Sequence, residues 1–323
     1  MMSLSLFRNV PIASAAAATS AVLFLTACSS SGIQRGESTL PTAAVPAAPL
    51  EWGQTGSIRP DGVSTKDLFV GEFCPYCTHY TNLVQIYQNG TFKKLGQIKQ
   101  GINDPIGTWV DSHGLYVANG FSPTVTQYSY LTSTPFTYKA GMSLPQAVTT
   151  DRQGDIFEAD GAGYVNEYYQ QADFVVTKCS VVGGGPSGVA SGTTGENVFV
   201  AYWSGSVGHI VDFTDFDACN NKVLGVRLGA TGGMAVDKND HIIVTEPTNG
   251  AVDIIQPPYK TVSAHLGSGW ADPTDVKINA ANNRAWVSDN GDVVEVYYPS
   301  GKVIGSIVLA AANTAVDGSN YVP

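Results

Sequence analysis

The 323-residue chain carries little charge, and most of that charge is negative. Charged residues make up 14% of the sequence, with 17 Lys and Arg against 27 Asp and Glu, which gives a formal net charge of −10. Because an acidic surface repels phosphate backbones, we expect no nucleic-acid partner. The sequence also contains no G-x-S-x-G, Walker or H-E-x-x-H motif. Those absences exclude the enzyme classes that depend on these motifs.

Long apolar runs are also scarce, and the main one lies at the N-terminus. Residues 10–27 follow Arg8 and contain Pro11, so the run falls short of the roughly 20 residues of a spanning helix. It ends in Leu25-Thr-Ala-Cys28, which resembles a bacterial lipobox. The resemblance implies a lipoprotein signal peptide over residues 1–28, lipidation (palmitate included) at Cys28, and, with Ser29 next, the outer membrane. The alternative is an ordinary signal peptide or membrane anchor.

The next segment, residues 29–60, is rich in Ser, Ala, Pro and Gly and is expected to form a flexible tether. The remaining residues, 61–323, form the expected folded domain. The 35 glycines of the full chain suit many short strands joined by tight turns.

A repeated unit accounts for most of this domain. In residues 104–128, three short extended runs are separated by the turns Asp111-Ser-His-Gly114 and Asn119-Gly120. Related second-strand cores occupy residues 68–70, 115–117, 156–157, 198–200, 242–244 and 285–287. Third-strand anchors follow at spacings of 41, 40, 45, 42 and 42 residues, at Val84, Val125, Val165, Ile210, Val252 and Val294. This period, with four short strands in each unit, is typical of a β-propeller blade.

The two ends of the chain predict how such a ring would close. The first unit begins at Leu68 without a preceding first strand, and residues 313–320 supply a spare first strand and its turn. We therefore predict an all-β, six-bladed propeller of four-stranded antiparallel blades, with one blade completed by both ends. The alternative is an open pair of β-sheets, which does not explain the spare strand.

The repeat resembles NHL-type propellers and is similar to the virginiamycin B lyase and gluconolactonase-like families. The resemblance rests on Pro105-Ile-Gly107 with Asp111 and Gly114, and on Tyr116-Val-Ala118. It also rests on Pro145 with Asp151 and Gly154, and on Pro186-Ser-Gly188. In the two enzyme families, acidic and Asn or His side chains hold a metal ion in the channel, which here implies Ca²⁺ or Mg²⁺ as the candidate cofactor.

Polar residues just after the second strands are the first candidate site. They are Glu72, Asn119, Asp160, Glu246 and Asp289, with Tyr202 interrupting the series. Equivalent positions in a ring could converge on one rim and offer oxygen ligands to a divalent cation. The alternative is that they cap turns, a role for which Glu is less suited than Asp or Asn. His113, His209, His241 and His265 share no repeat position and are expected at surfaces or turns.

The cysteines are the second candidate. Cys74-Pro-Tyr-Cys77 matches the glutaredoxin motif, but no βαβ pattern follows, so a loop disulfide or a metal site with His79 competes with redox activity. Cys179 and Cys219 lie about one repeat apart and could bridge adjacent blades. These four cysteines allow three pairings, and free buried thiols remain the alternative.

The third candidate is a set of aromatic side chains suited to a sugar or peptide ligand, with packing between blades as the alternative. The set is Trp109, Phe121, Tyr202, Trp203, Trp270 and Trp286. Trp286 lies in the middle of a strand and is expected in the core. The sequence favours a monomeric, lipid-anchored binding or scaffold module for a protein, peptide or carbohydrate. The alternative is a metal-dependent propeller enzyme of lyase or lactonase type.

Overall fold

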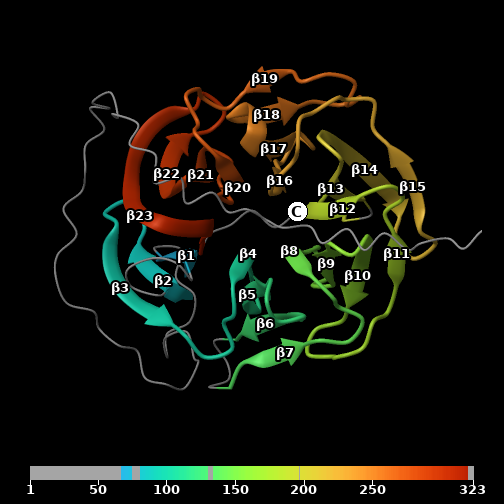
Figure 1. The fold of residues 1–323 in the computed structure, drawn as a ribbon, viewed down its shortest axis with the longest axis horizontal. Helices are drawn as coiled ribbons and strands as arrows, with labels where there is room; N and C mark the ends of the chain where they lie inside the picture. Colours follow the sequence, from blue (N-terminus) through green and yellow to red (C-terminus); the bar gives the residue numbers. More distant parts are fainter. Residues whose placement is uncertain (1–66, 75–80, 130–133, 196, 319–323) are drawn as a thin grey trace, which may run out of the picture. The chain divides into compact units, whose positions relative to one another are not determined.

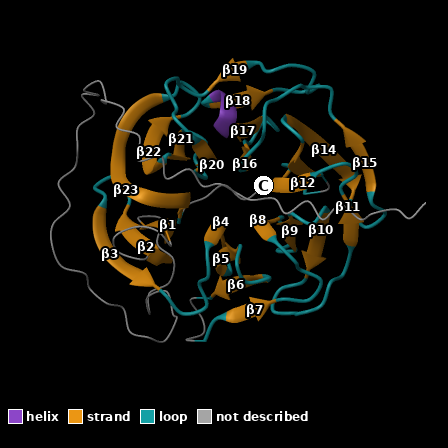
Figure 2. Ribbon diagram, in the orientation of Figure 1, coloured by secondary structure: helices purple, strands orange, loops and turns teal. Residues whose placement is uncertain are grey.

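The fold consists of short antiparallel strands, with one turn of 3₁₀ helix at Pro247–Asn249 among the described residues (Figure 2). The computed structural model describes residues 67–74, 81–129, 134–195 and 197–318. Several predictions concern residues outside these ranges: the signal peptide, Cys28, the tether and Cys77. For Cys74, the described part is the backbone of a strand.

One unit shows how the sequence makes a sheet. Strands β4 (Pro105–Asp111), β5 (Gly114–Asn119), β6 (Thr124–Tyr128) and β7 (Phe136–Tyr138) pair in sequence order. All six residues of β5 are buried, because this strand has a neighbouring strand on each side and a neighbouring sheet on each face. The β-branched and aromatic residues of its Leu115-Tyr-Val117 core suit such a position.

Three further sheets repeat this arrangement. The first contains β8 (Pro145–Thr150), β9 (Ile156–Asp160), β10 (Tyr164–Tyr168) and β11 (Lys178–Ser180). The second contains β12 (Gly185–Ser191), β13 (Val198–Ser204), β14 (Val207–Asp215) and β15 (Asn220–Val223). The third contains β16 (Met234–Val236), β17 (Ile242–Glu246), β18 (Ala251–Ile255) and β19 (Ala264–His265).

The remaining strands form a single seven-stranded sheet. Its order is β20 (Pro273–Ile278), β21 (Arg284–Asp289), β22 (Gly291–Tyr297), β23 (Lys302–Asp317), β1 (Asp67–Cys74), β2 (Thr81–Gln88) and β3 (Lys93–Ile98). The prediction of six separate four-stranded sheets is therefore wrong: the described residues form four such sheets and one larger one. The reason is the long strand β23, which pairs with β22 in its first half and with β1 in its second.

The pairing between β23 and β1 brings the two ends of the domain together. Leu68 lies opposite Asp317 and Val70 opposite Ala315, in antiparallel register. We call this contact the seam. The C-terminal segment thus lies beside the segment at Leu68, which is the neighbour that the sequence predicts for it.

The sheets stand side by side around a common centre, with β4, β8, β12, β16 and β20 nearest to it (Figure 1). Each of these strands contacts the next, from β4 to β8, β12, β16 and β20, and β23 contacts both β20 and β4. The arrangement is propeller-like.

The core lies between the faces of neighbouring sheets. One apolar cluster, for example, joins Phe157 and Val165 of one sheet to Val200 and Phe213 of the next. Another lies within the seven-stranded sheet, where Leu68 and Tyr87 pack with Trp286 and Ile307. Trp286 is 1% exposed, so its prediction as a core residue is confirmed.

Candidate functional site

The polar residues predicted to form a rim lie at equivalent positions of the sheets. Asn119, Asp160, Tyr202 and Asp289 pair with Pro105, Pro145, Pro186 and Pro273, at the start of the innermost strands, and a bulge follows each pair. Glu72 pairs with Ala312 beside the corresponding bulge of the seam. We call this side of the ring the loop end. It comprises the turns from second to third strands and the loops that lead into the innermost strands.

Asp160 illustrates what these side chains do. Its carboxylate is buried and accepts hydrogen bonds from the backbone N–H groups of Ser143 at 2.7 Å, Leu144 at 3.0 Å and Ala162 at 2.9 Å. The first two donors lie in the loop before β8, and the third lies in the turn after β9. Asp160 therefore fixes two loops of the loop end at once, as a charged acceptor for backbone donors.

Three other members act in the same way. The backbone N–H of Asn103 donates to Asn119 Oδ1 at 2.9 Å, and that of Gly229 donates to Glu246 Oε2 at 2.8 Å. Asp289 Oδ1 accepts from the N–H groups of Ala271 at 2.9 Å and Asp272 at 2.7 Å. The expectation that Glu246 braces turns poorly is therefore wrong, because its longer side chain reaches the loop before β16.

Glu72 differs from the other acids. It accepts one hydrogen bond, from Gln85 Nε2 at 3.2 Å, and its buried Oε1 has no hydrogen-bond partner among the described residues. Burial raises the pKa of Glu72 to about 6, against the opposing effects of the Gln85 hydrogen bond and the positive charge of Lys94. Glu72 is thus an acid that the fold keeps partly protonated near neutral pH and does not use as a backbone brace.

The described residues do not assemble the predicted metal ligands. Within these ranges, no three His, Cys, Asp or Glu side chains come close enough together to hold a metal ion. Each rim acid stays at the end of its own strand, and Asp160, Glu246 and Asp289 accept backbone N–H donors instead.

One acidic pair does form at the loop end. Burial, together with a hydrogen bond from and the charge of Glu246, raises the pKa of Asp253 to about 7. His265 Nδ1 lies 2.7 Å from Asp253 Oδ1 and opposes this shift. A carboxyl group in this environment can exchange a proton near neutral pH.

Small residues let the innermost strands approach each other. A Cβ atom on Gly107 would lie 2.8 Å from Ala147 Cα, and one on Gly188 would lie 2.9 Å from the carbonyl oxygen of Gly232. Both distances are shorter than real side chains tolerate, so the Gly of the Pro-x-Gly motif is required by packing around the centre. Sequence reasoning treated this motif as a family feature and missed its physical role.

A buried polar chain beside the seam connects the innermost strands β20 and β4 through β23. Lys277 Nζ lies 2.6 Å from Asp275 Oδ1, Thr314 Oγ1 donates to Asp275 Oδ2 at 2.5 Å, and the hydroxyls of Thr314 and Thr108 lie 2.8 Å apart. Asp275 is 4% exposed, and burial raises its pKa despite the lowering effect of Lys277. The chain joins β20, β23 and β4. The sequence offers no sign of it because the partners lie up to 206 residues apart.

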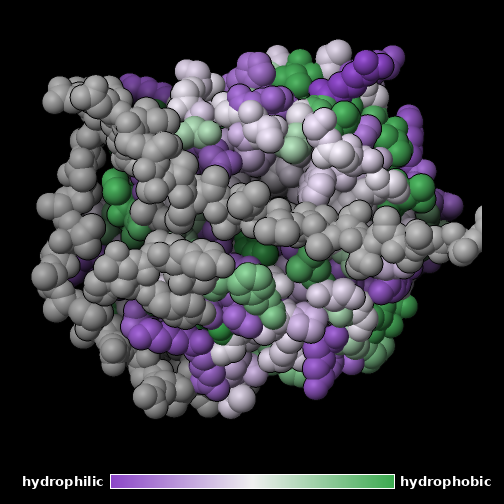
Figure 3. All heavy atoms as spheres, in the orientation of Figure 1, coloured by the Kyte–Doolittle hydropathy of each residue, from purple (hydrophilic) through white to green (hydrophobic). Residues whose placement is uncertain are grey.

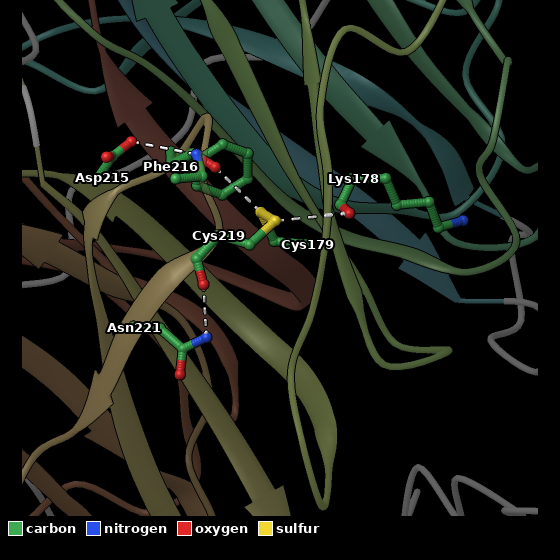
Figure 4. The surroundings of a disulfide bond; sticks show 7 residues. Lys178, Cys179, Asp215, Phe216, Cys219 and Asn221 are labelled. Carbon is green, nitrogen blue, oxygen red and sulfur yellow. Dashed lines mark hydrogen bonds between the residues drawn. A yellow bond between two sulfur atoms is a disulfide. The ribbon is translucent and has the colours of Figure 1, made fainter.

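The disulfide between Cys179 and Cys219 is present, as the repeat spacing suggested. It connects β11 with the turn between β14 and β15, and so joins neighbouring sheets at their outer edge (Figure 4). Cys179 is fully buried and its Sγ lies 3.2 Å from the carbonyl oxygen of Phe216. The alternative of two free thiols is therefore wrong for this pair.

Apolar side chains are exposed along the loop end of three consecutive sheets. The members and their exposures are Phe121 66%, Leu144 38%, Tyr164 38%, Val182 82% and Val207 43%. The loops that carry Leu144, Tyr164 and Val182 touch: a Cβ on Gly161 would lie 3.0 Å from Leu144 Cδ2, and one on Gly185 would lie 3.0 Å from the carbonyl oxygen of Gly161. We call this set the apolar row. On the face seen in Figure 3, apolar residues likewise occur as patches between hydrophilic ones.

Two aromatic contacts support the apolar row. Phe121 packs edge-to-face on Phe73, with ring centroids 5.0 Å apart. Tyr202 stacks on His209 at 5.1 Å, two residues after Val207. Of the six predicted aromatic candidates, Phe121 is strongly exposed and Trp203 and Trp270 are half-buried, whereas Trp109, Tyr202 and Trp286 are buried.

The described residues contain no helix that is long and apolar enough to span a membrane. Neither a family profile nor a curated protein sequence matches the chain. Among solved structures, a chain from the crystal structure of a nidogen/laminin complex is similar, with a TM-score of 0.63 and 14% sequence identity. The match covers 77% of this chain and 97% of that one. That neighbour is a β-propeller, so the comparison supports the propeller fold, and at this identity it carries the fold alone.

Proposed function

We propose that this chain is a lipid-anchored binding module of the bacterial cell envelope, in which a six-bladed, NHL-like propeller presents the apolar row to a partner protein. The observation that carries the proposal is the combination of exposed apolar side chains and rigid loops at one end of the ring. Exposed apolar groups that neighbour one another mark interaction surfaces, and bracing lowers the entropy cost of binding.

The six-bladed ring is part of this proposal. The seven-stranded sheet counts as two blades because residues from its two halves pack face to face, as do residues of separate neighbouring sheets. Strand β23 would then serve as the outermost strand of one blade and the innermost strand of the next. This count agrees with the six repeats in the sequence.

A protein is the partner we favour over nucleic acid, because the surface is acidic and the exposed groups of the apolar row are uncharged. Side chains such as Phe121 and Tyr164 supply contact area with few rotatable bonds, which suits protein recognition. We further propose that the propeller acts as a monomer held at the outer membrane through Cys28. Replacement of Cys28 by Ala should move the protein from the membrane fraction to the soluble fraction.

Site-specific photo-crosslinking tests the binding face. A photoreactive phenylalanine analogue is placed at Phe121 or Tyr164, and, as matched controls, at Phe174 or Tyr169. The control residues are exposed aromatic side chains between β10 and β11, at the opposite end of the ring. We expect a discrete adduct with one envelope protein from positions 121 and 164 in living cells, and none from 174 and 169.

The adduct should disappear when Val207 and Val182 are both replaced by Asp, provided that the thermal unfolding of the variant is unchanged. Adducts of equal yield from both ends, or none from position 121, would contradict the proposed binding face.

The acidic pair Glu246 and Asp253 favours one second candidate, a metal-dependent lyase or lactonase at the loop end. On that account, Ca²⁺ or Mg²⁺ should raise the melting temperature, EDTA should reverse the rise, and Glu246→Gln should abolish it. The binding account predicts the same melting temperature under all of these conditions.

A further inference from the structure

A pocket of about 250 Å³ lies at the end of the ring opposite to the loop end. Its walls come from two neighbouring sheets: the β16–β17 turn and strands β18 and β19 on one side, and the β20–β21 turn and the residues after β22 on the other. Pockets for drug-sized ligands begin at roughly 300 Å³, so this one suits a smaller molecule of about one sugar ring.

The floor of the pocket is a buried carboxylate whose hydrogen bonds are complete. Asp237 accepts from the backbone N–H groups of Asn239 at 2.7 Å and His241 at 2.9 Å, and from the hydroxyl of Tyr298 at 2.8 Å. His241 Nδ1 lies 3.0 Å from Asp237 Oδ2. These contacts leave the carboxylate little capacity to attract a cation, and they fix the ring of Tyr298 across the joint between the two sheets.

The hydrogen bonds of Asp237 differ from those of Asp111, which occupies the equivalent turn of the β4–β7 sheet. Asp111 also accepts from backbone N–H groups in its turn, but its tyrosine partner, Tyr116, belongs to the same sheet. At Asp237 the tyrosine comes from the neighbouring sheet instead. The hydrogen bond between Tyr298 and Asp237 therefore crosses the joint, whereas the one between Tyr116 and Asp111 does not.

The walls combine amide groups with apolar surface. Asn239, Gln256 and Asn282 line the pocket, and each carboxamide offers both a donor and an acceptor. Ile254, Ala264 and Pro299 supply the apolar part. The lining contains no Lys or Arg. His241 uses Nδ1 on Asp237, which leaves Nε2 available to a ligand.

These properties select a ligand class. An anion lacks a positive partner in this pocket, and a cation finds a carboxylate that is already satisfied. A neutral molecule with several hydroxyl groups can pair with the carboxamides, because a hydroxyl both donates and accepts, while its C–H face packs on Pro299 and Ala264. We propose that this pocket binds a neutral hexose unit, as a free sugar or as a residue of a glycan.

The test uses the purified full chain and a panel of methyl glycosides of glucose, galactose, mannose and N-acetylglucosamine. Binding is measured by saturation-transfer NMR and calorimetric titration. We expect at least one glycoside to bind saturably, with a Kd on the order of 1 mM. Gln256→Ala and Asn239→Ala should each weaken this binding by at least about fivefold, since each removes a hydrogen-bonding group.

Asn220→Ala is the matched control, because Asn220 is an exposed amide on β15 that lies outside the pocket lining. It should leave the affinity unchanged. Ala264→Trp, which fills the pocket, should abolish binding without lowering the melting temperature. No saturable binding by any glycoside, or binding that Gln256→Ala and Ala264→Trp leave intact, would overturn the proposal. Neither result bears on the apolar row, which lies at the other end of the ring.

Discussion

Two contacts between neighbouring parts of the ring are held in different ways. The joint between the β8–β11 and β12–β15 sheets carries the Cys179–Cys219 disulfide at its outer edge. The seam between β23 and β1 is held by strand pairing, and a buried chain from Lys277 through Asp275 and Thr314 to Thr108 fixes β23 beside it to β20 and β4. The first contact is covalent and peripheral, and the second is non-covalent and central.

The difference follows the separation of the partners along the chain. The disulfide links residues 40 apart, in sheets that follow one another in the sequence. The seam pairs Leu68 with Asp317, which lies 249 residues further along the chain, so it must offset a larger loop-closure entropy. The acids at the strand ends also differ between the two contacts. Asp160, beside the joint, accepts hydrogen bonds from two loops, whereas Glu72, at the seam, accepts none from a loop. We therefore expect the seam to be the more sensitive of the two contacts.

The largest effect is expected in the buried polar chain beside the seam. Asp275→Ala leaves the ammonium group of Lys277 buried without its partner, which should lower the free energy of unfolding by about 3–5 kcal/mol in a denaturant titration. Asp275→Ala combined with Lys277→Met should recover most of the loss, because no unpaired charge remains. A loss below about 1 kcal/mol for the single variant would show that the polar chain does not fix β23 to β20 and β4.

At the joint, replacing both Cys179 and Cys219 by Ala should lower the free energy of unfolding by about 2–4 kcal/mol, since a loop of about 40 residues is no longer closed in the unfolded chain. Chemical denaturation with and without a reductant measures this. The reductant should destabilise the parent protein and leave the double variant unaffected. If the reductant affects both proteins equally, the disulfide does not stabilise the joint.

The brace at Asp160 should have a smaller effect. Asp160→Asn replaces one carboxylate oxygen with an NH₂ group that faces backbone donors. This should lower the free energy of unfolding by about 1–3 kcal/mol. Amide hydrogen exchange at Ser143 and Leu144 should quicken, because these N–H groups lose their acceptor. Unchanged exchange at these two sites would contradict the bracing role.

The smallest effect, with the opposite sign, is expected at Glu72. Its pKa is raised from 4.5 to about 6 in the folded protein, so the folded state binds more protons than the unfolded state between these pH values. The stability that this group contributes is present below pH 4.5 and is lost as the pH rises to about 6. Glu72→Gln should therefore stabilise the protein by up to about 2 kcal/mol at neutral pH.

Stability curves over pH separate this effect from a general improvement in packing. The gain for Glu72→Gln should vanish at about pH 4, where the glutamate is protonated in both states. A gain in stability that persists at pH 4, or a loss of stability at neutral pH, would contradict the raised pKa of Glu72.

The strands were predictable where burial imposes a pattern. Second strands such as β5 and β21 are flanked by strands on both sides, so their cores show runs of β-branched and aromatic residues, and Trp286 follows from the same argument. The outermost strands β11, β15 and β19 have few buried positions, and their sequences carry no comparable pattern. The merging of two units into one sheet depends on the length of β23, which no local pattern encodes.

The candidate site was predictable in position but not in role. The repeat spacing located Asp160 and Glu246 at equivalent strand ends. Their partners, Ser143 and Gly229, are loop N–H groups without a side-chain motif, so the sequence could not choose between bracing and metal binding. The pocket around Asp237 was missed because Tyr298 lies 61 residues away, on a neighbouring sheet.

Native-state hydrogen exchange across the seam tests the pairing of β23 with β1 most directly. Peptides covering residues 67–74 and 312–317 should exchange as slowly as those of β13, and Asp275→Ala should release both together, because they form one contact. Fast exchange in either segment of the parent protein, or release of one segment without the other, would contradict the pairing of β23 with β1.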